Sequence, residues 1–511
     1  MNDTAACWTR LDETPRQTLQ ALFSQDGERV AKYSGSLTIG DSEILFDWSK
    51  THLSDDLVAA FEGLATASGF DAARQTMLTG GIANPTEGRA AEHTAERGMG
   101  ADESVVRADV FHMRMRGLVE AIHEAVLGPV KHLIHIGIGG SALGPALAID
   151  ALARPTSDWR APVDVHVVSN IDGNALEAAF EACDPATTMI AVASKTFTTI
   201  ETMTNAASAI QWLEESNVAD PYGKVVALTA SPDKAVEWGV DESRVLPFSE
   251  SVGGRYSLWS SIGFPVALAL GWDRFAQFLE GAAAVDRHFA DADGFANLPL
   301  RAAFADLMYV QLRGCQTRAV FAYDERLGLF PDYLQQLEME SNGKSVTADG
   351  QPLGRPSAPI TWGGVGTDAQ HAVFQLLHQG TVEVPVDFLA VKQPGHDLDP
   401  EHHAILLTNC FAQGAALMAG KASDDGARAY PGDRPSATIL CDAMTPATLG
   451  ALIAFHEHRT FASAVLLGIN PFDQFGVELG KQIANEIAAG EGGKFDPSTE
   501  ALLKAAGLKP A

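Results

Sequence analysis

A glycine-rich turn around residues 137–140 is the first stretch of the sequence that could do chemistry. It breaks an apolar run of Leu133, Ile134, Ile136 and Ile138, which is typical of a buried parallel strand, predicted here over residues 131–138. Ser141 comes next and is placed to cap a helix predicted over residues 142–153. Glycines let the backbone approach a ligand closely, and the free N–H groups of a helix N-terminus favour negative charge. We therefore expect a phosphate near Ser141.

Two other interpretations of this turn stay open on these residues alone. The Gly-x-Gly-x-x-Ala spacing from Gly137 to Ala142 also fits a dinucleotide-binding fingerprint. That interpretation calls for an acidic residue at the end of the next strand, but residues 163–168 lead into Ser169 and Asn170. The other interpretation is a glycine turn that only packs a helix against a strand.

A second candidate phosphate loop follows the predicted strand at residues 188–193. It reads Ser194-Lys195-Thr196-Phe197-Thr198-Thr199, and hydroxyls with a lysine at the carboxyl end of a strand suit a phosphate monoester. The glycines of a Walker A loop are missing, and an ordinary helix cap is the simpler interpretation of this stretch alone. Two such loops in one sheet favour a phosphosugar or a similar small ester. Glu201 lies just inside the next helix, where a carboxylate also suits the helix dipole.

Three further residues could transfer protons. Glu340 is expected in a turn between amides and a lysine, and there it could act as a general base if it lined a pocket. His371 opens a helix predicted over residues 370–379 and could donate a proton near neutral pH. Lys481 is a cation on a predicted core helix, residues 477–488. Their simpler roles are a solvated glutamate, a capping histidine and a lysine that reaches the surface.

Metal and serine-nucleophile motifs are not evident in the sequence. The histidine-rich stretches 401–403 and 456–458 lack the HExxH spacing, and we expect both on solvated helix faces. No Gly-x-Ser-x-Gly elbow occurs. The sequence therefore predicts neither a metal site nor a serine hydrolase.

Strands and helices alternate along two long stretches, which predicts an α/β fold with two doubly wound parallel sheets. The strands expected in the first sheet are 131–138, 163–168, 188–193, 224–229 and 244–247. The strands expected in the second are 319–323, 359–362, 386–391 and 437–440. The run from Trp362 to Thr367 again predicts a strand, a glycine turn and a helix, so we expect two related halves.

The segments before and after these units are predicted to be mainly helical. Near the start, a hairpin is expected where residues 37–39 and 44–46 flank Gly40-Asp41. We expect four parts: a mainly helical N-terminal extension (1–125), a phosphate-binding α/β domain (126–285), a second α/β domain (286–489) and a C-terminal tail (490–511).

Composition limits the classes of partner. The chain has 511 residues, is 46% hydrophobic and 20% charged, and carries a net charge of −29, so nucleic acid and anionic membranes are not expected as partners. Its five cysteines are scattered, as in a protein of a reducing compartment. The sequence starts without a basic and apolar signal segment, and no apolar run is long enough to span a bilayer. We expect a cytoplasmic location.

Taken in order, these stretches make the chain resemble the glucose-6-phosphate isomerase family. The matching stretches run nearly end to end and are dense in the two α/β units: residues 46–50, 84–87, 93–95, 135–145, 168–173, 194–202, 252–259, 339–344, 366–381 and 470–481. Each stretch is moderate evidence by itself, whereas the ordered set is specific.

The resemblance implies a fold and an activity. The fold is two sugar isomerase (SIS) domains of flavodoxin-like architecture with helical N-terminal and C-terminal extensions, assembled as a homodimer with shared active sites. The activity is aldose–ketose isomerisation, which interconverts glucose 6-phosphate and fructose 6-phosphate in glycolysis and gluconeogenesis. The reaction opens the sugar ring and passes through a cis-enediolate, and it requires no metal or organic cofactor.

The resemblance also assigns roles to residues. The phosphate-binding set is Gly140, Ser141, Ser194, Lys195, Thr196 and Thr199. Glu340 would be the base, Arg255 would stabilise the enediolate, and His371 with Lys481 would open the ring. Gln336 and Gln474 would line the pocket, and Glu201 would orient His371.

A phosphosugar-sensing SIS protein without catalysis is the alternative. It needs the phosphate loops but not the four catalytic residues together. All four are present in this chain, which favours the enzyme.

Overall fold

The computed structural model describes residues 4–157, 159–489 and 495–508. One compact unit ends at Pro471, and a second begins at Phe472. The glycine-rich start of the predicted tail, residues 490–494, lies outside the described residues, as do residues 1–3, 158 and 509–511.

The first sheet is the predicted one. Its strands, in spatial order, are β4 (Asp164–Val168), β3 (His132–Ile136), β5 (Thr188–Ala193), β6 (Val225–Thr229) and β7 (Val245–Pro247), and each pairs in parallel with its neighbours. Every residue of β5 and β6 is buried, which explains why both strands are apolar except for Thr188 and Thr229 at their ends. The strand order reverses direction between β3 and β5. In open α/β sheets this switch point is where ligands bind, beyond the carboxyl ends of the strands.

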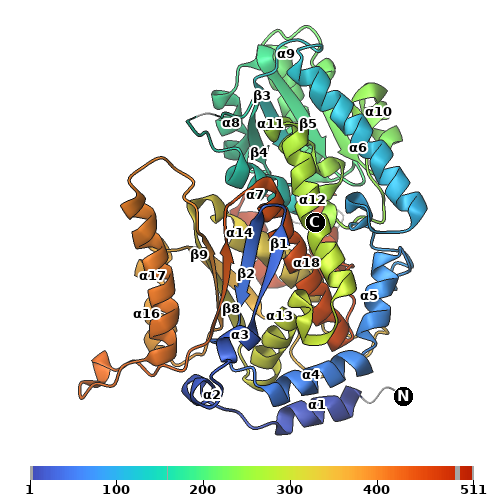
Figure 1. Cartoon of the computed structure of the whole chain (residues 1–511). Helices are drawn as coiled ribbons and strands as arrows, with labels where there is room; N and C mark the ends of the chain where they lie inside the picture. Colours follow the sequence, from blue (N-terminus) through green and yellow to red (C-terminus); the bar gives the residue numbers. More distant parts are fainter. Residues whose placement is uncertain (1–3, 158, 490–494, 509–511) are drawn as a thin grey trace. The chain divides into compact units, whose positions relative to one another are not determined.

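Helices cover both faces of this sheet, so the doubly wound prediction is confirmed. One face packs on α8 (Gly173–Ala182), α9 (Ile200–Glu215) and α10 (Pro232–Trp238). Packed around the other side are α6 (Asp102–His123), α7 (Leu143–Leu152) and α11 (Phe264–Leu270) (Figure 1).

The second sheet has four parallel strands and an antiparallel edge among the described residues. Its order is β1 (Ser34–Ile39), β2 (Ser42–Asp47), β11 (Ser436–Cys441), β10 (Val386–Val391), β8 (Thr317–Tyr323) and β9 (Ile360–Val365). The predicted N-terminal hairpin therefore forms, with Gly40 at its turn at a φ of +57°. Its second strand continues this sheet, because β2 pairs antiparallel with β11.

The remaining helices of the first unit surround the second sheet. They are α1 (Thr4–Glu13), α2 (Leu19–Gln25), α3 (Arg29–Tyr33), α4 (Asp55–Ala67), α5 (Phe70–Leu78), α12 (Trp272–Asp291), α13 (Leu298–Leu307), α14 (Phe330–Leu334), α15 (Asp368–Ala372), α16 (Phe374–Gln379), α17 (Pro400–Ala419) and α18 (Pro446–Leu467). The long helices α12 and α18 run side by side (Figure 1). On the other side of the sheet, α16 and α17 pack through Phe374 and Leu417 against β8 and β10.

Two local predictions are wrong. Gly363 and Gly364 do not form a turn but continue β9, and a Cβ at Gly363 would lie 1.8 Å from the carbonyl oxygen of Val320 on β8. Glycine is needed there because the neighbouring strand approaches closely. The predicted helix over residues 370–379 is also interrupted at Val373, between α15 and α16.

The predicted solvated face at residues 456–458 is also wrong, because these residues lie in the interior. His458 Nε2 lies 2.7 Å from Asp286 Oδ1, and Glu457 Oε2 accepts a hydrogen bond of 2.6 Å from Arg97 Nη1. None of the side chains of Arg97, Asp286, Glu457 and His458 has any exposed surface. Charges can be buried here because each finds an opposite partner from a distant helix or turn.

The second unit is helical. It contains α19 (Glu478–Ala489) and α20 (Pro497–Ala505), close to the predicted ranges. The prediction that the first of these is a core helix is wrong for the described chain, since none of its residues is buried.

Within the described ranges, no helix is both long enough and apolar enough to cross a bilayer.

Candidate active site

The first predicted phosphate loop lies where β3 ends. Gly139, Gly140 and Ser141 form a single 3₁₀ turn before α7, and Gly139 adopts a φ of +58°, which favours glycine. The expected capping role of Ser141 is wrong, because Ala142 is the N-cap of α7 and no side chain caps that helix. Among the described residues, Ser141 Oγ has no hydrogen bond, so the hydroxyl is available to a ligand.

A buried histidine stabilises this loop through a hydrogen bond to its backbone. His135 on β3 is fully buried, and its Nε2 donates a hydrogen bond of 2.7 Å to the carbonyl oxygen of Ser141. Its Nδ1 is buried without a hydrogen-bond partner. Burial lowers the pKa of His135 to about 4, so the ring is neutral at pH 7.

This histidine should make the fold sensitive to acid. Between pH 6.5, the ordinary value for histidine, and about pH 4, the unfolded chain binds a proton at this position that the folded chain does not. The free energy of unfolding should therefore fall with falling pH, by about 2 kcal/mol at pH 5 from this group. His135→Gln should reduce this slope in urea unfolding measured at several pH values, while the exposed control His402→Gln should not. Equal slopes in all three proteins would contradict the assignment.

The second predicted phosphate loop follows β5 and lies beside the first. A Cβ at Gly137 would lie 3.2 Å from the Cβ of Ala193, the last residue of β5. Ser194 Oγ and Thr199 Oγ1 are 3.0 Å apart, and Thr199 does not cap α9 with its side chain. The capping interpretation of this hydroxyl is therefore wrong. The α9 N-terminus and the hydroxyls instead form one polar surface suited to an anion.

Lys195 links this loop to the turn that carries Arg255. Its ammonium donates hydrogen bonds to the carbonyl oxygens of Glu250, at 2.6 Å, and Val252, at 3.0 Å. Burial, and then the Arg89 guanidinium, lower the pKa of Lys195 to about 8. A bound phosphate would favour the charged form of this lysine. Thr196 is exposed in the same loop, with its hydroxyl 2.8 Å from that of Thr198.

The backbone at Arg255 touches the first loop directly. A Cβ at Gly140 would lie 2.1 Å from the carbonyl carbon of Gly254 and 2.4 Å from the nitrogen of Arg255. Only glycine allows two backbones to approach this closely. Gly140 therefore sets the distance between the phosphate loop and the Arg255 guanidinium.

Arg255 is held in a fixed orientation. Its side chain is almost fully buried, and Nε donates a hydrogen bond of 2.6 Å to Ser341 Oγ. Nη2 donates to the carbonyl oxygen of Pro471, and Nη1 lies 3.6 Å from Glu340 Oε1. The hydroxyl of Tyr256 also lies 2.9 Å from Ser341 Oγ. A guanidinium held this way can stabilise negative charge that develops beside it.

Glu340 ends a π-helical segment, Gln335–Glu340, and not the predicted turn. Its Oε2 accepts a hydrogen bond of 2.8 Å from Gln336 Nε2, and its side chain is 22% exposed. A Cβ at Gly139 would lie 3.0 Å from Gln336 Nε2, so Gln336 connects the glutamate to the first phosphate loop. One carboxylate oxygen is thus held by an amide, while part of the side chain remains accessible to a substrate, as a general base requires.

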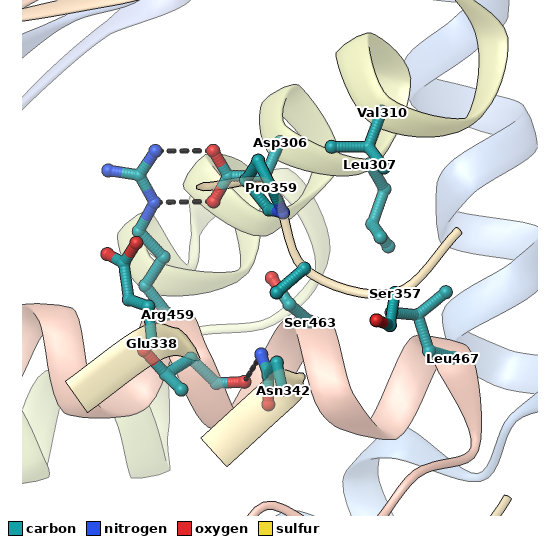
Figure 2. A pocket seen from close by; sticks show the side chains of 12 residues that line it. Asp306, Leu307, Val310, Glu338, Asn342, Ser357, Pro359, Arg459, Ser463 and Leu467 are labelled. Atoms are coloured by element: carbon teal, nitrogen blue, oxygen red, sulfur yellow. Dashed lines mark hydrogen bonds and ion pairs between the residues drawn. The ribbon is translucent and has the colours of Figure 1, made fainter. Parts of the chain in front are cut away.

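Buried contacts on both sides of Glu340 hold this segment. Glu338 pairs with Arg318 and accepts a hydrogen bond of 2.6 Å from Thr361 Oγ1. Asn342 Nδ2 donates 2.9 Å to the carbonyl oxygen of Thr460 on α18. Glu338 and Asn342 both line a small cavity of about 30 Å³ below the segment (Figure 2). The position of Glu340 is therefore set by the protein interior rather than by a loop.

Two predicted residues, His371 and Glu201, make no hydrogen bond or ion pair with this cluster among the described residues. His371 is exposed on α15, and within the described ranges no hydrogen bond or ion pair connects it to the loops of Ser141, Arg255 or Glu340. Glu201 is half-buried in the first turn of α9 and has no hydrogen bond to His371 among the described residues. Gln474 and Lys481 lie in the second unit, Lys481 on α19.

Sequence reasoning missed the residues that orient Arg255. Ser341 and Tyr256 lie next to predicted catalytic residues and within the matching stretches 339–344 and 252–259, and these were the signals that could have pointed to them. Trp259 was matched but given no role. Its Nε1 donates 2.8 Å to Glu457, which joins the Arg255 turn to the buried charges on α18.

Comparison with known proteins shows which family the chain resembles. The family model described as phosphoglucose isomerase matches residues 47–503. A glucose-6-phosphate isomerase of Novosphingobium aromaticivorans is 74% identical over 501 residues, 98% of each chain. One of Zymomonas mobilis is 58% identical over 98% of this chain and 97% of its own. A crystal structure of a glucose-6-phosphate isomerase from Chlamydia trachomatis superposes with a TM-score of 0.88 at 29% identity, covering 99% of both chains. Because the family model matches residues 47–503, and relatives at 58% to 74% identity match 98% of the chain, this protein belongs to the phosphoglucose isomerase family.

Proposed function

We propose that this protein interconverts glucose 6-phosphate and fructose 6-phosphate as an aldose–ketose isomerase. The observation that carries this proposal is that Glu340 Oε1 lies 3.6 Å from Arg255 Nη1, beside two adjacent phosphate-type loops. Relatives at 58% to 74% identity over nearly the whole chain are named for this reaction. The pathway would be glycolysis and gluconeogenesis.

The phosphate group binds at the switch point of the first sheet. The hydroxyls of Ser141, Ser194, Thr196 and Thr199 donate to its oxygens, and the N-terminus of α9 and Lys195 supply positive charge. These local charges act against the net charge of −29, so the anion is drawn by the site and not by the whole protein.

Glu340 then moves the proton between C2 and C1. In the forward direction it removes the hydrogen on C2 of the open-chain aldose, and the electrons shift onto O1 to give the cis-enediolate. Arg255 offsets the negative charge on the oxygens. The hydroxyl proton of O2 moves to O1, the same carboxyl returns the carbon-bound proton to C1, and the carbonyl forms at C2. Gln336 holds the carboxylate through its 2.8 Å hydrogen bond.

The ring must open before this transfer. A proton is delivered to O5 and another is removed from the anomeric hydroxyl. We assign these two transfers to His371 and Lys481, with Gln474 as a further contact to the sugar and Glu201 as the partner of His371. The assignment rests on the family and on residue chemistry. A metal or organic cofactor is not needed for any of these steps.

His371 is proposed to act in the active site of a second subunit. It is exposed and borders an open cavity of about 610 Å³ with Phe374, His378 and Tyr430, away from the hydrogen-bonded cluster around Glu340 in its own chain. A homodimer in which each subunit donates this histidine would account for its exposure. Nucleic acid and membranes are not expected partners, and we propose a cytoplasmic location.

Mixed dimers test this exchange. One chain carries Glu340→Gln and the other His371→Ala, with different tags so that only heterodimers are purified. If His371 acts in trans, one site receives both changes and the other has none. The heterodimer should then show about half the wild-type turnover of the cyclic sugar, although each homodimer is severely impaired. Turnover no better than the mean of the homodimers would place His371 in its own subunit's site.

A coupled assay for fructose 6-phosphate turnover tests the function itself. The protein should convert the aldose to the ketose and back, at a rate that depends on Glu340. A non-catalytic sensor would bind the phosphosugar with no turnover, and that result would overturn the proposal.

A further inference from the structure

A histidine–cysteine cluster lies toward the amino ends of the first sheet's strands, opposite the carboxyl ends that carry the phosphate loops. His132 is the first residue of β3, His166 is on β4, and Cys183 follows α8. The phosphate loop begins at the other end of β3, roughly 16 Å away for five residues of extended chain. The cluster is therefore separate from the catalytic site.

Strand register brings the two histidines to one face of the sheet. His132 pairs with Asp164, and His166 is two residues further along β4, so all three side chains point to the same side. Their ring centroids are 5.8 Å apart. The connection after α8 then brings Cys183, which is 8% exposed, onto the same side.

The three residues offer metal ligands to one point. One nitrogen of each ring and the sulfur of Cys183 all lie within 4.8 Å of one another. His132 Nδ1 and His166 Nε2 are buried and have no hydrogen-bond partner among the described residues. Buried nitrogens without a partner are unfavourable, so a group that binds both would remove an existing cost. Packing of two neutral rings on a thiol would leave that cost in place.

We propose that His132, His166 and Cys183 bind one zinc-type divalent ion. Two imidazoles and a thiolate are a ligand set that Zn²⁺ prefers over Mg²⁺ or Ca²⁺. Water, or the carboxylate of Asp164, would complete a tetrahedral site. Bonds of about 2.0–2.3 Å place such ligand atoms roughly 3.3–3.8 Å apart, so a small side-chain rotation closes the present spacing.

The ion would act as a structural clamp. It would join β3, β4 and the connection from α8 to β5, three segments that otherwise meet only through strand pairing and packing. Because the cluster is at the far edge of the sheet, the ion would raise thermal stability and leave the isomerase reaction unchanged.

The test uses the full-length protein without a histidine tag, stripped with a chelator and titrated near neutral pH with Zn²⁺ or Co²⁺. One equivalent should bind with a dissociation constant below about 1 µM, and cobalt should give the thiolate charge-transfer and intense visible bands of a tetrahedral site. Zinc should raise the melting temperature by at least about 2 °C. Turnover should not change when the ion is removed.

Variants locate the ion. Cys183→Ser and His166→Gln should each weaken binding at least about tenfold, and Cys183→Ser should abolish the charge-transfer band. Cys315→Ser, another buried free thiol, and His402→Gln, one of the exposed residues near His396, should bind as wild type does. The proposal would be overturned if the protein bound no equivalent of the ion tightly, or if all four variants bound the ion equally well. If Cys183→Ser or His166→Gln fails to fold, the other ligand variant carries the test.

Discussion

Glu340→Gln should lower turnover in both directions by at least about a hundredfold, the lower end for loss of a general base. Glutamine keeps the shape of the side chain. Its amide oxygen can face Arg255, and its NH2 group can donate to Gln336 once the Gln336 amide turns its oxygen toward it. The substituted side chain cannot accept the hydrogen from C2. Phosphosugar binding should stay within about tenfold, or about 1.4 kcal/mol, because the phosphate loops are unchanged.

Isotope exchange separates this role from a structural one. Exchange of the C2 hydrogen with deuterated solvent should fall together with turnover, because both need the enediolate. Ring opening of glucose 6-phosphate should continue, since it is assigned to His371 and Lys481. Glu103→Gln, at an exposed position on α6 with no role in the proposed site, is the control and should retain C2 exchange. If Glu340→Gln exchanged at the wild-type rate, Glu340 would not be the base and Glu201 would be the next candidate.

Gly140→Ala should disable the site by a purely steric route. The new Cβ would lie 2.1 Å from the carbonyl carbon and 2.2 Å from the carbonyl oxygen of Gly254, and backbone atoms cannot rotate away. The phosphate loop and the Arg255 turn must therefore separate. A displacement of about 1 Å between groups that act together costs about a hundredfold in rate, and overpacking of this kind costs about 1–3 kcal/mol of stability.

The partner glycine supplies the control. A Cβ at Gly254 would meet nothing within 4 Å, so Gly254→Ala adds the same methyl group on the other side of the same contact without a clash. We expect Gly254→Ala to keep turnover within about threefold and Gly140→Ala to lose about a hundredfold, with circular dichroism and thermal melting measured for both. Similar turnover in the two variants would show that the close approach does not position the site.

The strands could be predicted because their signals are local. Residues 189–193 and 225–228 are apolar without interruption, and a central parallel strand demands this pattern. Glycine turns are predicted less reliably. The sequence around Gly363 is typical of a turn, but Gly363 lies in a strand, where the missing side chain lets the carbonyl of Val320 approach closely. Strand or turn was decided there by an atom on another strand.

The candidate site was predicted as residues and not as geometry. Ser141, Ser194 and Glu340 were identified from motifs, and Arg255 from the family resemblance. The contact of Gly140 with Gly254 and the hydrogen bond that Arg255 donates to Ser341 could not be predicted from the sequence. A motif records which side chain is present. It does not record which backbone approaches it.

By itself, the sequence determined the two parallel sheets, the edge at which phosphate-type loops gather and the residue types available for proton transfer, because periodicity and short motifs are properties of neighbouring residues. Only the tertiary structure decided the rest. It buried His458 beside Asp286, 172 residues away, and it brought His132, His166 and Cys183 within reach of one ion. The physical reason is that burial and ligand geometry depend on what packs against a side chain, and in a chain folded through parallel crossovers those neighbours come from distant segments.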